Sequence, residues 1–316
     1  MKPGEKTIYV AQPHGFCAGV RRALDIADLV LQEADLPVYC LKEIVHNRMV
    51  VENLRGRGIV FVDSVDEAPR GATILFSAHG VSPAVRAKAR ELDLNIIDAT
   101  CPFVNKVHTQ VRKFAETGYI ILLLGYARHD EIIGVAGEAP GQVKVLENEE
   151  QAKLVQVKNP GKVALMTQTT LSIKETQKVY RILAGRFPKI QTAPRDCICY
   201  ATTNRQKAVS ELSKKCGIIF VLGSHSSSNT RRLAEVAAAN GSRSKVIESL
   251  EGLNEINIPQ AQNVGITAGA STPEQFVDDV LKFLLAHGFA RVENVCVAEE
   301  SISFRIPSEL RRKLSG

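Results

Sequence analysis

This chain of 316 residues has no tryptophan, and aromatic residues make up only 5% of it. It also lacks any block of roughly five or six like charges, although Lys and Arg outnumber Asp and Glu by 40 to 34. Proteins that bind nucleic acids often combine basic patches with aromatic side chains on which bases stack, so this composition disfavours that class. The net charge of +6 indicates either a mild surface excess or an anionic substrate or acidic protein partner.

Long apolar segments are missing as well. The longest purely apolar run, around residues 120–124, has about six residues, whereas a membrane-spanning helix needs about 20. The N-terminal stretch MKPGEKTIYVAQ has neither the apolar core nor the cleavage site of a secretory signal. We therefore expect a cytoplasmic protein that does not enter the membrane. Its length predicts two or three domains of about 100–150 residues each.

Seven cysteines are present, an odd number that does not indicate a disulfide framework in a chain without an export signal. The C-x-x-C pair that is typical of zinc sites is absent, and the closest pair is Cys197 and Cys199. The thiols are therefore either buried and inert, or they are metal ligands or catalytic groups.

Three of the cysteines share one local setting. Cys17, Cys101 and Cys199 each stand at a turn that leads from an extended segment into a sequence with helical spacing. They are 84 and 98 residues apart, which is the spacing of small domains. Three similar units, each donating one thiol, would produce this pattern.

Two further strand-to-helix turns follow each cysteine, and each carries a polar side chain. The first polar position falls 29, 28 and 28 residues after its cysteine, and the second falls 62, 68 and 72 residues after it. In chain order these residues are His46 and His79, His129 and Thr169, and Ser227 and Ser271. Serine and threonine at such turns are often only helix caps. Histidines are poor caps, so three at matching positions indicate a site.

Repeated strand–helix–strand units predict parallel sheets covered by helices, and ligands of such sheets bind at the carboxyl ends of the strands. All nine turns lie at those ends. If three domains turned these edges inward, three thiols and a ring of His, Thr, Ser and Asn side chains would surround one cavity. Helix N-termini with such side chains suit a phosphate or diphosphate.

Three thiols from three domains could hold zinc or a 4Fe-4S cluster. Thiols spread along the chain suit a cluster assembled between domains. Three thiolates leave one iron of such a cluster without a protein ligand, and an open iron can bind a substrate hydroxyl. Loss of that hydroxyl as water needs a proton donor. Glu131, in ARHDEIIG, is the candidate donor, with Asp130 as its competitor; the alternative is that Glu131 is a solvated first-turn glutamate.

The motifs that carry these residues resemble those of the 4-hydroxy-3-methylbut-2-enyl diphosphate reductase family, which acts last in the methylerythritol phosphate route to isoprenoids. The resemblance covers nearly the whole chain and rests, in this order, on GFCAGVRRA, IVHN, FSAHGVS, DATCP, KVH, MTQTTLS, ICYATTNRQ, SSN and TAGAS. It implies an α/β fold of three similar small parallel-sheet domains, arranged as a pseudo-threefold trefoil around a central 4Fe-4S cluster.

The resemblance also implies residue roles. The cluster ligands would be Cys17, Cys101 and Cys199. Thr169 would contact the substrate hydroxyl and relay a proton from Glu131, with His129 beside them in the catalytic group. The residues that would hold the substrate diphosphate are His46, His79, His129, Ser227, Ser228, Asn229 and Ser271.

The reaction implied is the reductive dehydroxylation of 4-hydroxy-3-methylbut-2-enyl diphosphate to isopentenyl and dimethylallyl diphosphates. Ferredoxin or flavodoxin would supply the electrons to a monomer or homodimer. Two alternatives remain open: an aconitase-like hydro-lyase, which would need no external reductant, and a non-enzymatic iron–sulfur or zinc protein.

The spacing of the units places the domains at residues 18–101, 102–195 and 1–17 with 196–286, followed by a C-terminal arm at 287–316. Cys197 is an extra thiol that could replace Cys199 as a ligand. We interpret Cys40, Cys216 and Cys296, which match no motif position, as buried small hydrophobic residues.

Overall fold

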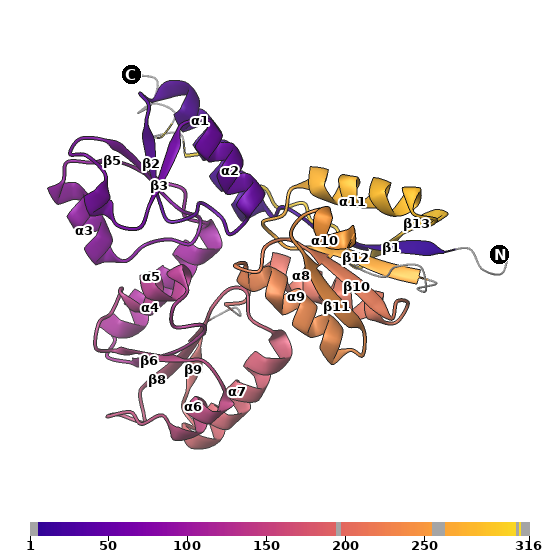
Figure 1. Cartoon of the computed structure of the whole chain (residues 1–316). Coiled ribbons are helices and arrows are strands. Elements are labelled where there is room, and N and C mark those ends of the chain that lie inside the picture. The colour runs from indigo at the N-terminus through magenta and orange to yellow at the C-terminus, as the bar shows by residue number, and fades with distance from the viewer. Residues whose placement is uncertain (1–5, 194–196, 255–262, 308–309, 311–316) are drawn as a thin grey trace. The chain divides into compact units, whose positions relative to one another are not determined.

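The computed structural model describes residues 6–193, 197–254, 263–307 and 310. Within these ranges the strands form three sheets, and every strand pairing is parallel (Figure 1). The strand orders are β3-β2-β4-β5, β7-β6-β8-β9 and β11-β10-β12-β1-β13. This confirms the predicted fold class of three small parallel-sheet α/β domains.

The first sheet is built from the segment that follows Cys17. Its strands are β2 (Val38–Leu41), β3 (Ile59–Val62), β4 (Thr73–Phe76) and β5 (Asn95–Asp98). The helices of this stretch are α1 (Ala18–Glu33), α2 (Arg48–Gly56), α3 (Pro83–Glu91) and the short 3-10 helix η1 (Val65–Glu67). Helix α3 begins after Ser82, whose side chain caps the N–H of Val85, and its Ala89 packs against Ile74 and Phe76 of β4.

The second sheet shows how an apolar run becomes a strand buried on both faces. Its strands are β6 (Ile120–Leu124), β7 (Val143–Leu146), β8 (Val163–Thr167) and β9 (Gln191–Thr192), and its helices are α4 (Pro102–Glu116), α5 (Asp130–Ala136), α6 (Glu149–Leu154) and α7 (Ile173–Arg186). Side chains alternate along β6, so Ile121 and Leu123 meet α4 and α5 while Leu122 and Leu124 meet α6 and α7.

The third sheet combines both ends of the chain. Its strands are β1 (Thr7–Gln12), β10 (Ile218–Leu222), β11 (Arg243–Ile247), β12 (Asn263–Ala268) and β13 (Arg291–Cys296), and its helices are α8 (Tyr200–Ser213), α9 (Ser228–Ala239), α10 (Glu251–Asn254) and α11 (Glu274–Ala286). Ile219 and Val221 of β10 pack with α8 and α9, and Phe220 and Leu222 pack with α10 and α11.

Helices α4 and α8 each leave one sheet and pack on the next. Helix α4 follows β5 of the first sheet but packs on β6, and α8 follows β9 of the second sheet but packs on β10. We propose domain limits at these helices, which gives residues 18–101, 102–195 and 1–17 with 196–286. Residues 194–196, where the second limit falls, lie outside the described ranges.

The predicted arm, 287–316, starts as part of the third domain. Its strand β13 pairs with β1 over Arg291–Cys296 and adds a fifth strand at the edge of the sheet. The end of the arm lies mostly outside the described residues. None of the described helices is long and apolar enough to cross a membrane.

Two compact units can be separated in the chain. Unit 1 contains residues 1–18, 46–50 and 200–302, and therefore the third sheet. Unit 2 contains residues 19–45, 51–199 and 303–316, and therefore the first and second sheets.

Candidate functional site

Each of the three candidate ligand cysteines immediately precedes a helix. Cys17 lies before α1, Cys101 before α4 and Cys199 before α8. Cys101 occupies the N-cap position of α4 without a side-chain cap bond, and Pro102 begins the helix where no N–H partner is needed. Because the N-terminus of a helix stabilises negative charge, all three positions suit the binding of a negatively charged group.

The backbone setting of the three cysteines is also the same. In each case the cysteine N–H donates to a carbonyl oxygen two residues past the end of a neighbouring strand, β12, β4 or β8. These bonds join Cys17 to Ala270 at 3.1 Å, Cys101 to Ala78 at 3.0 Å and Cys199 to Thr169 at 3.1 Å. The three cysteines are therefore equivalent residues of a threefold structural repeat.

This equivalence changes one register predicted from the sequence. Thr169 matches Ala78 and Ala270, so the residue that matches His79 and Ser271 is Thr170. Counting from the cysteines could not show this, because the units differ in length between the cysteine and the strand end. The first polar positions do match: His46, His129 and Ser227 each lie five residues past the end of β2, β6 or β10.

The remaining cysteines differ in their surroundings. Burial raises the pKa of Cys40 and raises that of Cys216 to about 12, so both thiols stay protonated in the core. The prediction that Cys296 is buried is wrong, because this residue ends the edge strand β13 and is exposed. Cys197 packs partly into the core of the second sheet, with its Sγ 3.9 Å from the Sδ of Met166.

A buried arginine lies beside Cys101. Arg22 Nη1 donates to the carbonyl oxygen of Thr100 at 3.0 Å, and Arg22 and Cys101 are close enough to interact electrostatically. Burial lowers the pKa of Arg22, an effect that negative charge on Asp98 and Cys101 opposes. Burial would raise the pKa of Asp98, but Arg86 and the hydrogen bonds from Thr100 outweigh it and hold that pKa below its ordinary value. A cation is thus in place next to the thiol.

Glu131 is not a solvated glutamate, since it is only 2% exposed. Its Oε1 accepts the N–H of Thr169 at 2.7 Å, and its Oε2 accepts the hydroxyl of Thr169 at 2.8 Å. The structure therefore brings together the first turn of α5 and the turn after β8. The solvated alternative is excluded.

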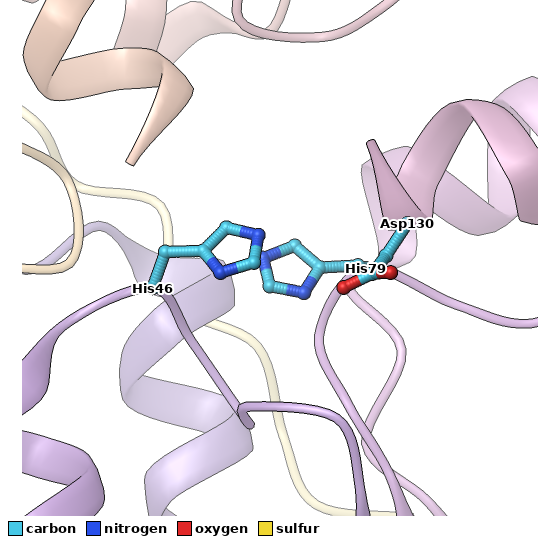
Figure 2. A group of neighbouring side chains, drawn as sticks. All are labelled: His46, His79 and Asp130. Carbon is cyan, nitrogen blue, oxygen red and sulfur yellow. The ribbon is translucent and has the colours of Figure 1, made fainter. Parts of the chain in front are cut away.

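Two histidines of unit 2, His129 and His79, belong to the same region as this pair. His129 is the N-cap of α5, and its Nδ1 accepts the N–H of Glu131 at 3.1 Å, so the expectation that histidines at these turns are not caps is wrong for His129. Its ring meets that of His79 edge-on, with centroids 5.6 Å apart. His79 and Asp130 each offer a ligand atom within 4.8 Å of the other; Figure 2 labels both, together with His46 of unit 1.

The predicted residues of unit 1 meet at the turn after β12. Asn229 Oδ1 accepts the N–H of Ala270 at 2.8 Å, and Ser271 donates its hydroxyl to the carbonyl oxygen of His46 at 3.0 Å. Ala270 is also the residue whose carbonyl binds the amide of Cys17. Ser227 caps α9 through the N–H of Thr230 at 3.3 Å. The amide Nδ2 of Asn229 is buried without a hydrogen-bond partner among the described residues, so a donor is left for a ligand.

Sequence reasoning missed two residues near the cysteines, Arg22 and Tyr200. Burial raises the pKa of the Tyr200 hydroxyl to about 12, and the charge of Cys17 adds to this rise. Tyr200 directly follows Cys199, yet its side chain lies near Cys17. The only signal in the sequence was that both residues fall inside the quoted motifs GFCAGVRRA and ICYATTNRQ.

A family model described as LytB protein matches residues 8–285. The chain belongs to the LytB family. Two bacterial relatives named 4-hydroxy-3-methylbut-2-enyl diphosphate reductase support this assignment. The one from Acidothermus cellulolyticus is 44% identical over 99% of this chain and 92% of its own length, and the one from Rhodococcus opacus is 45% identical over 98% and 92%.

Solved structures agree with the LytB assignment. The E-1-hydroxy-2-methyl-but-2-enyl-4-diphosphate reductase from Plasmodium falciparum matches with a TM-score of 0.94 at 33% identity, covering 98% of both chains. A structure of (E)-4-hydroxy-3-methyl-but-2-enyl diphosphate reductase matches with a TM-score of 0.64 at 31% identity, covering 89% of this chain and 99% of that one. The resemblance drawn from the motifs is confirmed, and this LytB chain is an enzyme of the oxidoreductase class.

Proposed function

We propose that this enzyme reductively removes the hydroxyl of 4-hydroxy-3-methylbut-2-enyl diphosphate and releases isopentenyl diphosphate and dimethylallyl diphosphate. Two electrons and two protons are consumed, and water leaves. The observation that carries the proposal is the equivalence of Cys17, Cys101 and Cys199, each at a helix N-terminus with its amide bound at the same point of a sheet. The choice of substrate follows from the names of the relatives, which are 4-hydroxy-3-methylbut-2-enyl diphosphate reductases.

These residues fit a 4Fe-4S cluster with three protein ligands. The three thiols are partly buried, and none of the seven cysteines, all of which lie in the described part of the chain, forms a disulfide. Each thiol lies at the N-terminus of a helix, and Arg22 adds a positive charge next to Cys101, so the surroundings suit a negatively charged cluster. When bound, such a cluster supplies single electrons and a Lewis-acidic iron that lacks a protein ligand. Cys197, packed against Met166, is the less suitable thiol of its pair.

In this proposal the diphosphate is held by the polar residues at the strand ends. His79 and His129 in unit 2 can donate from ring nitrogens. In unit 1 the buried Nδ2 of Asn229 keeps a donor, and α9 adds its N-terminal dipole. The full set proposed for the diphosphate is His46, His79, His129, Ser227, Ser228, Asn229 and Ser271.

Glu131 and Thr169 form the proposed proton path. As an ionised group, Glu131 accepts the hydroxyl hydrogen of Thr169. Once protonated, Glu131 can donate to Thr169 Oγ1, and the hydroxyl hydrogen of Thr169 is then released toward the leaving oxygen of the substrate. Water is excluded around the pair, because both residues are buried, so the proton has one defined route. We prefer Glu131 to Asp130 as the proton source because both carboxylate oxygens of Glu131 bind Thr169.

We further propose that ferredoxin or flavodoxin delivers the electrons in the cytoplasm. The net charge of +6 supports an acidic partner of this kind, and seven cysteines without a disulfide support a reducing compartment. A single chain, or a homodimer of it, would carry a complete site, because one chain supplies all three proposed ligands, Cys17, Cys101 and Cys199.

The test is an anaerobic assay with 4-hydroxy-3-methylbut-2-enyl diphosphate, run with and without a chemical reductant. We expect both five-carbon products only when reductant is present, with two electrons consumed for each product. Turnover without reductant would instead support a hydro-lyase. No turnover under either condition, from protein that contains its cluster, would overturn the proposed function.

A further inference from the structure

The segment from Glu300 to Arg305 contacts residues that flank all three ligand cysteines. It lies beyond β13 and outside the repeated strand–helix pattern, and none of its residues belongs to the site described above. Its contacts fall in both units, Glu300 in unit 1 and Phe304 with Arg305 in unit 2.

The first anchor is an ion pair between the partly exposed Glu300 and the buried Arg205. Both carboxylate oxygens of Glu300 accept from Nη1 of Arg205, at 3.0 and 3.2 Å, and Oε1 also accepts from Asn204 at 3.2 Å. Arg205 lies in the second turn of α8, the helix that begins after Cys199, and it is fully buried. Its charge therefore depends on Glu300 for compensation.

The same arginine reaches the loop that carries Cys17. Arg205 Nη2 donates to the carbonyl oxygen of Gly15 at 2.7 Å, and Nη1 also donates to Ala201 at 3.1 Å. Gly15 adopts a positive φ of 67°, and its N–H donates to Ala268 at the end of β12. The guanidinium of Arg205 thus joins the 300–305 segment, the first turn of α8 and the Cys17 loop.

The second anchor lies next to Cys101. The ring of Phe304 meets that of Phe103 edge-on, with centroids 5.7 Å apart, and Phe103 is in the first turn of α4. The carbonyl oxygen of Arg305 accepts from Nε of Arg22 at 3.4 Å. Arg22 in turn holds the carbonyl oxygen of Thr100, the residue before Cys101.

We propose that the 300–305 segment is a strap that fixes the cysteine loops in the geometry needed to retain the cluster, with Glu300 as its main positioning residue. Glu300 acts through Arg205 on the loop of Cys17 and on the helix behind Cys199, and Phe304 and Arg305 act on the loop of Cys101. This inference rests on the proposed function, because it requires the three cysteines to be cluster ligands.

The strap gives a role to the buried Arg205. A buried guanidinium is costly unless it is paired and hydrogen-bonded. Arg205 donates to backbone carbonyls of the first turn of α8, at Ala201, and of the Cys17 loop, at Gly15, and Glu300 provides the counter-charge that keeps it there. Glu300→Gln keeps the size of the side chain but removes the charge and turns one acceptor into a donor.

The experiment compares full-length proteins purified without air. The test variant is Glu300→Gln, and the matched control is Glu235→Gln, which removes the carboxylate 2.6 Å from another buried arginine, Arg232. Glu299→Gln, an exposed neighbour, is a second control. Three quantities are measured: iron content, the rate at which the cluster absorbance decays in the presence of an iron chelator, and hydrogen exchange of residues 14–17 and 200–205.

We expect Glu300→Gln to lose its cluster about fivefold faster than wild type, which corresponds to roughly 1 kcal/mol. Hydrogen exchange should rise in the two named segments only, and Glu300→Asp should restore part of the retention. Both controls should match wild type. Phe304→Ala should speed the loss of the cluster, whereas Ile302→Ala, at an exposed position between the anchors, should not.

Equal decay rates in Glu300→Gln and Glu235→Gln would overturn the strap, as would faster decay without a local rise in hydrogen exchange. If wild-type protein holds no cluster at all, the proposed function itself fails. In that case a local rise in hydrogen exchange in Glu300→Gln would show that Glu300 orders the two segments, but the proposed role in retaining a cluster would be overturned.

Discussion

Both carboxylate oxygens of Glu131 accept hydrogen bonds from one residue, Thr169, through its backbone N–H at 2.7 Å and its hydroxyl at 2.8 Å. The amide of the ligand candidate Cys199 is bound to the carbonyl oxygen of the same threonine at 3.1 Å. Thr169 therefore connects the proposed proton source to the turn that carries a proposed cluster ligand. The proton path and the cluster ligands can be tested separately.

Replacing Glu131 by Gln should abolish proton delivery while leaving the protein folded. The amide oxygen can still accept the N–H of Thr169, but the side chain no longer carries a transferable proton. We expect the turnover rate to fall by about 10²–10⁴-fold, the usual contribution of a general acid. Steady-state turnover with a chemical reductant measures this, with iron content as the check on the cluster. An E131Q enzyme with wild-type turnover would remove Glu131 from the proton path.

Thr169→Val removes the hydroxyl and keeps the shape and the backbone N–H. We expect turnover to fall by at least about tenfold, because the proton then has no carrier between Glu131 and the substrate. Thr169→Ser restores a hydroxyl at the same place and should recover most of the activity. Equal losses in the valine and serine variants would show that the hydroxyl alone does not account for the role of Thr169, and wild-type turnover in Thr169→Val would remove the hydroxyl from the proton path.

Substitution of single cysteines should distinguish the cysteines that bind the cluster from those that do not. Cys17→Ser, Cys101→Ser and Cys199→Ser should each lower the iron content and the visible absorbance of anaerobically purified protein, because a thiolate ligand is lost. Cys197→Ser, two residues from Cys199, and Cys40→Ser, in the core of the first sheet, serve as controls and should keep both signals. A full cluster in all three ligand variants would contradict the ligand assignment.

Asp98 should stabilise the fold in a pH-dependent manner. Burial alone would raise its pKa, but the charge of Arg86 at 2.6 Å and the bonds from Thr100 lower that pKa below its ordinary value of 3.8. A lowered pKa means that the stabilisation is fully present well above pH 3.8 and is lost as the pH falls through the lowered value.

We therefore expect Asp98→Asn to cost roughly 1–2 kcal/mol of unfolding free energy at neutral pH. Urea unfolding of wild type and variant at neutral and at acidic pH should show that this difference narrows as Asp98 becomes protonated. A difference that does not change with pH would show that packing, and not charge, stabilises this position.

The repeat could be predicted from the sequence because each unit reuses the same strand-to-helix turns, so Cys17, Cys101 and Cys199 stand out together. The three parallel sheets follow from that repeat. The burial of Glu131 could not be predicted, since a glutamate in the first turn of a helix is as often solvated. The register of Thr169 could not be predicted either, because loop lengths vary between the units and only the backbone hydrogen bonds reveal which residues match.

The contacts of the 300–305 segment were the hardest feature to predict from the sequence. Glu300 lies 95 residues from Arg205, and nothing in the pattern around either residue points to the other. Arg22 sits in the same motif as Cys17 but lies beside Cys101, a long-range pairing that only the fold creates. In both cases a buried charge decides the contact, and burial of a single polar residue leaves no periodic signal in the sequence.

The most direct test of the central claim is a Mössbauer spectrum of the protein purified without air, recorded before and after addition of 4-hydroxy-3-methylbut-2-enyl diphosphate and without reductant. We predict a four-iron cluster in which one iron is distinct from the other three and changes its signal when the substrate is added. A complete cluster whose spectrum does not respond to substrate, or a protein that holds no cluster, would contradict the account.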